Sequence, residues 1–136
     1  MVTTCMKNYP LSLLTALAII VLSVIPFPEI KMAEDIPLAD KWVHFIMYGG
    51  LSLVVWFEMA RREKKTKTKK AASLLLLWGL VLPALLGGVL EFVQEYLTTT
   101  RSGDFWDFVA DAIGAVLGTV LGVLLRPLLV RVTSHV

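Results

Sequence analysis

Residues 71–97 read AASLLLLWGLVLPALLGGVLEFVQEYL, and this stretch decides the class of fold. Its only charged residues are Glu91 and Glu95, both near its end, and Pro83 interrupts an otherwise apolar run. An α-helix needs roughly 20 apolar residues to cross about 30 Å of hydrocarbon. The stretch therefore predicts a transmembrane helix.

Three further stretches have the same character, at residues 9–27, 42–60 and 105–130. The chain is 57% apolar with a mean hydropathy of +0.74, and a soluble domain of 136 residues cannot bury that much apolar surface. A single cysteine, Cys5, excludes an internal disulfide. No small-residue cleavage site follows the first stretch, so we expect it to be retained. The sequence predicts an all-α membrane protein, with residues 1–136 forming one bundle of four transmembrane helices.

The charges predict how this bundle is oriented. Residues 61–70, RREKKTKTKK, form a basic segment between the second and third stretches. Nucleic-acid or anionic-lipid binding is the weaker interpretation, because basic loops between spans usually stay cytoplasmic. With both termini cytoplasmic, that side carries ten basic residues against two acids, and the other side three against nine. We expect an N-in, C-in multi-pass membrane protein, with no nucleic-acid partner.

Polar residues enter three of the apolar stretches at their predicted outer ends, where an ionisable group needs protein or water around it. Helical spacing places Lys41, His44, Tyr48 and Ser52 on one face of the second helix. Asp40 is its expected N-cap. An alternative is that Lys41 and Tyr48 anchor the interface and that His44 only packs.

The third and fourth helices carry matching polar faces. Glu91 and Gln94 share a face of the third helix with Gly87. On the fourth, Asp104 is the expected N-cap, and Asp107 and Asp111 follow one turn apart. Alternatively, these groups could serve as caps or as pairs between helices that fix packing. A stripe of small residues continues the face of the fourth helix and predicts close helix packing: Gly114, Gly118 and Gly122.

These faces, together with Arg101 in the loop before the fourth helix, predict a polar pocket in the outer half of the membrane. Its expected substrate-binding residues are Lys41, His44, Tyr48, Glu91, Gln94, Arg101, Asp107 and Asp111. His44 and Glu91 are the candidates for general acid/base catalysis. Glu91, Asp107 and Asp111 are weak candidates for a metal site, and no cofactor is expected.

The order of these residues resembles the VanZ-like family of small bacterial membrane proteins. The resemblance rests on Asp40-Lys41-x-x-His44-x-x-x-Tyr48, on Gly87-x-x-x-Glu91-x-x-Gln94, on Arg101, and on Asp107-x-x-x-Asp111-x-x-Gly114-x-x-x-Gly118. It spans nearly the whole chain, and both blocks in order are specific. The family pattern has Asn where this chain has Asp111, which adds a potential anion. The resemblance implies a role at the cell envelope, linked to glycopeptide (teicoplanin) susceptibility, but no defined reaction.

Three functions remain open. The pocket could bind the head group of a membrane lipid or a lipid-linked cell-wall precursor. It could instead belong to a membrane-embedded hydrolase or transferase, although no nucleophile is evident. The polar residues could also be interhelical contacts in a structural protein, with the glycine stripe as the face of a homo-oligomer. Head-group binding is the interpretation that the one-sided polar residues favour most.

Overall fold

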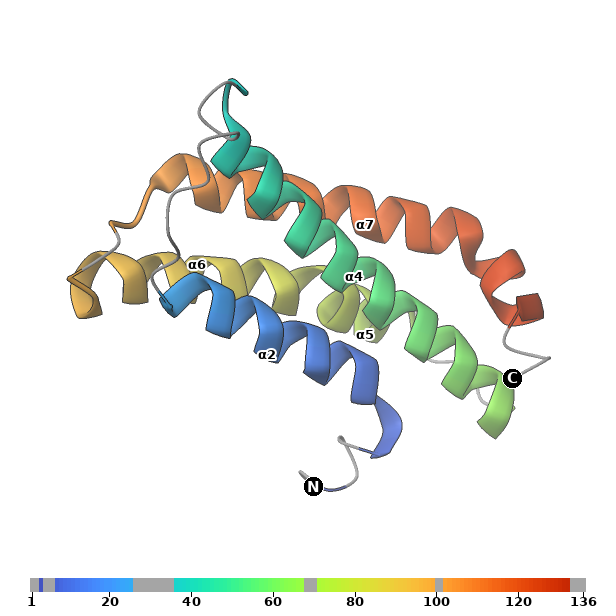
Figure 1. Ribbon diagram of the computed structural model, residues 1–136. Coiled ribbons are helices and arrows are strands. Elements are labelled where there is room, and N and C mark those ends of the chain that lie inside the picture. The colour runs from blue at the N-terminus through green and yellow to red at the C-terminus, as the bar shows by residue number, and fades with distance from the viewer. Residues whose placement is uncertain (1–2, 4–6, 26–35, 68–70, 100–101, 133–136) are drawn as a thin grey trace.

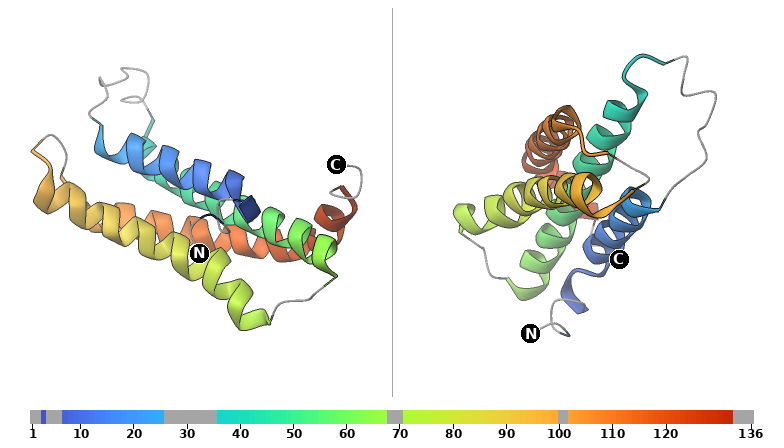
Figure 2. Two further views of the ribbon diagram at one scale, coloured as in Figure 1. Left: turned by 90° about the horizontal axis from the view of Figure 1, so that it is seen from below. Right: turned by 90° about the vertical axis from the view of Figure 1, so that its left-hand side faces the viewer.

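The computed structural model of the chain describes residues 3, 7–25, 36–67, 71–99 and 102–132, and within them it contains helices and no strand. The helices lie side by side along their length (Figures 1 and 2). Three are long and apolar enough to cross a membrane, at Ala39–Thr66, Ser73–Leu97 and Phe105–Leu128. The elements are α2 (Pro10–Val24), α4 (Ala39–Thr66), α5 (Ala72–Leu76), the π-helical turn η1 (Leu77–Val81), α6 (Leu82–Leu97) and α7 (Phe105–Val132).

The first helix, α2, is shorter than the 9–27 stretch predicted from the sequence. It has 15 residues, which is about 22 Å at 1.5 Å per residue. Pro10 starts it, since proline suits the first helical position. Ile25 is extended, with φ −77 and ψ 130, because the proline after it in the sequence disfavours the α conformation. Residues 26 and 27 lie outside the described part of the chain, and four membrane crossings stay a prediction.

The second helix, α4, extends beyond the predicted 42–60 at both ends. It continues to Thr66 through Arg61–Lys65, because arginine, glutamate and lysine all favour helix. The prediction that this basic segment is entirely loop is therefore wrong. The N-cap prediction for Asp40 is also wrong. The capping residue is Leu38, at φ 58, and Asp40 lies in the first turn, where its charge favours the positive end of the helix dipole.

The third helix is continuous from α5 through η1 to α6, and Pro83 explains its π-helical turn. In an α-helix the carbonyl of Gly79 would accept the N–H of residue 83, but proline has no N–H. The backbone adopts five π-helical residues, Leu77–Val81. The Thr119 hydroxyl of α7 donates a hydrogen bond of 3.0 Å to the freed Gly79 carbonyl. The proline thus creates a polar contact that fixes α7 against this turn.

The most extensively paired helices among the described elements are α4 and α7. A Cβ atom on Gly114 would overlap the Phe45 carbonyl oxygen, and one on Gly118 would overlap the Gly49 carbonyl oxygen. Gly122 faces the Trp56 ring at the same close range. The glycine stripe therefore packs against α4 of the same chain, and this face is not open to a second copy.

Candidate functional site

At one end of the bundle α4 and α7 begin and α6 ends (Figure 1). Charged side chains from these three helices meet there. This is the end that the charge distribution predicts to face outward. We call the group the polar cluster: Lys41, His44, Glu91, Asp104, Asp107 and Asp111. Because the members come from separate helices, the packing of α4, α6 and α7 sets their spacing.

Lys41 ties the start of α4 to the start of α7. Its Nζ atom lies 2.6 Å from a carboxylate oxygen of Asp40, and 2.7 Å from oxygens of both Asp104 and Asp107. The hydrogen bond from Lys41 holds the pKa of Asp104 below its usual value. Asp104 also accepts the N–H of Trp106 at 2.9 Å, which confirms it as the cap of α7.

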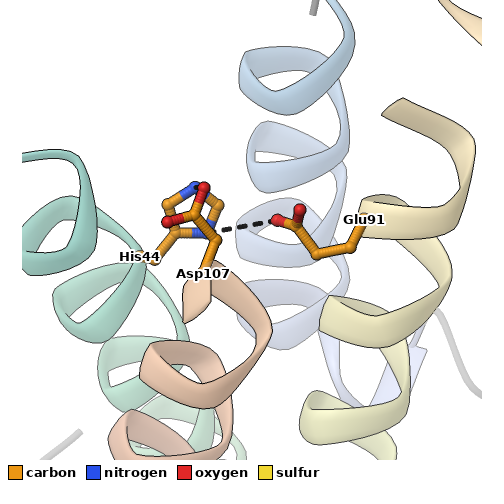
Figure 3. A group of neighbouring side chains, drawn as sticks. All are labelled: His44, Glu91 and Asp107. Carbon is orange, nitrogen blue, oxygen red and sulfur yellow. Dashed lines mark ion pairs between the residues drawn. The ribbon is translucent and has the colours of Figure 1, made fainter. Parts of the chain in front are cut away.

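His44 lies between carboxylates of α6 and α7 (Figure 3). Its Nδ1 atom is 2.9 Å from Asp111 Oδ1 and 3.8 Å from Glu91 Oε1. On the other side of the ring, Nε2 is 3.6 Å from Asp107 Oδ2. This 2.9 Å contact pairs His44 Nδ1 with Asp111 Oδ1, and an ionised Asp111 would accept the N–H of that ring nitrogen.

Asp111 is the most deeply buried acid of the cluster, with 0% of its surface exposed. Gly87 of α6 makes this position possible, because a Cβ atom there would lie 2.6 Å from Asp111 Oδ2. That oxygen has no hydrogen-bond donor among the described residues. A buried carboxylate oxygen without a donor is costly, so it marks a place where a further positive group would stabilise the cluster.

Glu91 links the cluster to the backbone before α7. Its Oε2 atom accepts the N–H of Asp104 at 2.9 Å, and its Oε1 atom faces His44. One turn later, Glu95 Oε2 accepts the N–H of Gly103 at 2.9 Å. Both glutamates thus hold this segment, but Glu91 is buried and Glu95 is exposed. Only Glu91 brings its carboxylate to His44.

The other residues predicted to line the pocket are placed differently. Tyr48 is buried in the apolar core, one turn below His44. Gln94 turns toward α2, where its side-chain amide donates to the Ser23 carbonyl at 2.8 Å, an acceptor at the end of that helix with no helical partner. Arg101 lies outside the described residues. Of the residues predicted to line the pocket, the structure therefore brings together Lys41, His44, Glu91, Asp107 and Asp111. Gln94 instead contributes to the packing of α6 against α2.

Two groups of side chains could hold a metal ion, with one ligand atom from each residue and all of these atoms within 4.8 Å of one another. One is His44, Glu91 and Asp107; the other is Asp40, Asp104 and Asp107. The sequence indicated Glu91, Asp107 and Asp111 only as weak candidates for a metal site. In the structure His44 stands in the group in place of Asp111, whose Oδ1 lies 2.9 Å from His44 Nδ1.

Sequence reasoning missed a buried acid at the opposite end of the bundle. Glu58 of α4 is 2% exposed and accepts the backbone N–H groups of Leu11 and Ser12, each at 2.8 Å. It also accepts the Ser12 hydroxyl at 2.6 Å. These donors form the unpaired N-terminus of α2, which Glu58 caps from another helix. The sequence did contain a signal for this contact, because Glu58 is an acid within an apolar stretch and such an acid requires a hydrogen-bond or charge partner.

A sequence model of a family described as VanZ/LLP1 matches residues 1–126 of the chain. The comparison with curated proteins found no match. The comparison with solved structures also found none.

Proposed function

This chain belongs to the VanZ/LLP1 family, and we propose that it is a cell-envelope membrane protein whose polar cluster binds the head group of a lipid or a lipid-linked wall precursor. The observation that carries the proposal is the convergence of Lys41, His44, Glu91, Asp107 and Asp111 from three helices at one end of an apolar bundle. In a membrane this end lies at the depth of lipid head groups. An ionisable residue within an apolar span is by default a functional group.

The rim of the cluster is the part that a head group would contact. The side chains of Asp40 and Asp104 are 61% and 42% exposed, and that of Lys41 is 20% exposed between them. Their carboxylates suit sugar hydroxyls and amino groups, which donate hydrogen bonds. Arg101, three residues before Asp104 in the sequence, would supply a planar cation for a phosphate. Such a mixed rim fits a head group that carries both hydroxyls and phosphate.

Lipid binding is tested by native mass spectrometry of the protein extracted with its membrane lipids. Glu91→Ala removes the carboxylate that faces His44, and should abolish the lipid adduct of the wild-type protein. Glu95→Ala is the matched control, because Glu95 lies one turn away, contacts the same loop and does not reach His44. Circular dichroism would establish that both variants are folded. Equal adducts in the two folded variants would contradict the proposal.

A role at the envelope predicts a change in glycopeptide susceptibility. Expression of the wild-type chain should raise the teicoplanin concentration needed to inhibit growth, and Glu91→Ala at equal membrane abundance should not. An unchanged inhibitory concentration with the wild-type chain would argue against this part of the proposal.

The proposed orientation places both termini and the basic end of the bundle in the cytoplasm. The supporting feature is the concentration of Arg61, Arg62, Lys64 and Lys65 at the end of α4. In a Cys5→Ser background, a membrane-impermeant maleimide applied to intact cells should label Thr99→Cys, which is exposed beyond α6. It should not label Lys64→Cys. The reverse pattern would overturn the orientation.

A second candidate function is hydrolysis or group transfer on a lipid-linked substrate. The hydrogen bond from His44 to Asp111 favours it, because a carboxylate that orients an imidazole leaves the other ring nitrogen available as a general base. In this mechanism Nε2 would accept a proton from water or a substrate hydroxyl, and Glu91 would be the second acid/base group. Turnover of lipid phosphates by the purified protein, lost in His44→Gln, would support catalysis. Absence of turnover in the wild-type protein would exclude it for those substrates.

A further inference from the structure

Among the described residues, the polar cluster contains more acidic than basic side chains. Glu91, Asp107 and Asp111 are 8%, 9% and 0% exposed. Among the described residues, Lys41 reaches Asp107 but is shared with Asp40 and Asp104. Glu91 and Asp111 are left with His44 as their nearest ionisable cation. Buried carboxylates this close repel one another unless further positive charge, or protons, lie between them.

The geometry of the cluster fits a metal ion at this position. His44, Glu91 and Asp107 come from α4, α6 and α7, and one ligand atom of each lies within 4.8 Å of the others. Figure 3 shows the imidazole ring and the two carboxylates turned toward one another. Side chains from three helices thus already lie within reach of one ion. Asp107 approaches Nε2 and Glu91 approaches Nδ1, so binding through Nε2 requires the Glu91 carboxylate to turn toward that nitrogen.

Asp111 supplies an independent indication. A histidine that binds a metal through one nitrogen usually donates the other N–H to a carboxylate, which fixes its tautomer. Asp111 Oδ1 lies 2.9 Å from Nδ1. In the neutral tautomer that carries its proton on Nδ1, His44 presents the lone pair of Nε2 on the side of Asp107. A lone pair facing a carboxylate oxygen at 3.6 Å is repulsive unless a cation lies between them. The second oxygen of Asp111 is buried and has no hydrogen-bond donor in the described part of the chain, which adds to the demand for positive charge.

We propose that His44, Glu91 and Asp107 bind a divalent cation, with Asp111 orienting the imidazole ring. One imidazole and two carboxylates suit a first-row ion such as Mn²⁺ or Zn²⁺ better than Ca²⁺ or Mg²⁺, which prefer all-oxygen sites. Three protein ligands leave at least one coordination position open. The open position would take a phosphate oxygen of the bound head group. Only this last role rests on the proposed function; metal binding itself does not.

The test is binding of Mn²⁺ to the purified, chelator-stripped full chain in detergent, followed by the loss of the free-ion signal in electron paramagnetic resonance. The wild-type protein should bind one ion. His44→Gln and Asp107→Asn should each weaken binding at least tenfold. Asp111→Asn keeps the three ligands but orients the His44 ring less firmly, and should lower the affinity for Mn²⁺ about ten- to a hundredfold. Glu95→Gln, the exposed neighbour of Glu91, should bind as the wild type does.

Three outcomes would overturn the proposal. If the wild-type protein bound no more Mn²⁺ or Zn²⁺ than folded His44→Gln, no metal would be held by His44. The negative charge of the cluster would then be balanced by protons or by a charged His44. Loss of binding in Glu95→Gln as well as in His44→Gln would mean nonspecific adsorption to acids. If Asp40→Asn abolished binding while His44→Gln did not, the ion would lie in the group formed by Asp40, Asp104 and Asp107. Circular dichroism on each variant separates loss of the site from loss of the fold.

The lipid adduct separates this inference from the proposed function. Lipid bound in buffer with Mn²⁺ and released by a chelator would support both. If Mn²⁺ bound to His44, Glu91 and Asp107 without any lipid adduct, the metal site would stand and head-group binding would fail. An adduct that persisted after complete removal of the metal would overturn the proposed contact between metal and phosphate.

Discussion

Replacement of Gly114 by alanine should separate the two helices that carry most of the site. In the structure, a Cβ atom on Gly114 would overlap the carbonyl oxygen of Phe45 and lie 3.1 Å from the backbone nitrogen of Gly49. Both contacts are to backbone atoms, which cannot rotate aside as the end of a side chain can. The new methyl group must therefore push α7 away from α4 near His44, the residue before Phe45.

Two effects of opposite sign set the expected change in the free energy of unfolding. Alanine in place of glycine within a helix stabilises the folded state by about 1 kcal/mol. Overpacking of a close contact costs typically about 1–3 kcal/mol, and the rigid backbone places this case toward the upper end. We expect a net loss of about 1–2 kcal/mol. Gly50→Ala is the matched control, because nothing lies within 4 Å of its Cβ position, and it should be neutral or stabilising by up to about 1 kcal/mol.

The assay is reversible unfolding of both variants in mixed micelles, followed by helical circular dichroism. The two variants should differ by about 1–3 kcal/mol in free energy of unfolding, with Gly114→Ala the less stable. If Gly114→Ala were as stable as Gly50→Ala, the close approach of α4 and α7 at this position would be refuted.

Two further predictions concern polar contacts away from the cluster, and both use the same unfolding assay. Glu58→Ala leaves the backbone N–H groups at the start of α2 and the Ser12 hydroxyl without their acceptor, and should lower the free energy of unfolding by about 2–4 kcal/mol. Glu58→Gln retains one acceptor oxygen and should lower it by less. An unchanged stability in Glu58→Ala would contradict the capping role of Glu58. Thr119→Val preserves shape but removes the donor to the Gly79 carbonyl that Pro83 leaves free, and should cost about 1–2 kcal/mol. Thr119→Ser keeps the hydroxyl but removes a methyl group from a buried position, and should cost about 0.5–1 kcal/mol. This is less than for Thr119→Val, so an equal loss in both would assign the effect to packing.

Much of the helical content was predictable, because a long apolar stretch that enters a membrane must satisfy its own backbone hydrogen bonds, and an α-helix does so. The third and fourth helices lie within one or two residues of the predicted ends. The errors came from local rules that hydropathy does not measure. The Ile25–Pro26 pair ends α2 early, and the helix propensity of Arg61–Lys65 carries α4 past its apolar part.

The site was predictable only as a set of helix faces. Spacing places Glu91 and Gln94 on one side of α6, but it cannot say how far α6 is rotated toward each neighbour. In the structure Glu91 faces His44, whereas Gln94 faces α2. The choice depends on an acceptor at the end of another helix, the Ser23 carbonyl. No spacing within α6 contains that information.

The glycine stripe and the polar cluster depend on one another. Asp111 reaches His44 from the turn just before Gly114, and Gly114 lies against the carbonyl of Phe45, next to His44 in the chain. The 2.9 Å bond between the two side chains thus exists because the backbones of α4 and α7 touch one turn further along. On α6, the third helix at the site, Gly87 has no side chain and so leaves room for the Asp111 carboxylate. Glycines that alone indicate only packing are therefore what brings the imidazole of His44 and the carboxylate of Asp111 together between three helices.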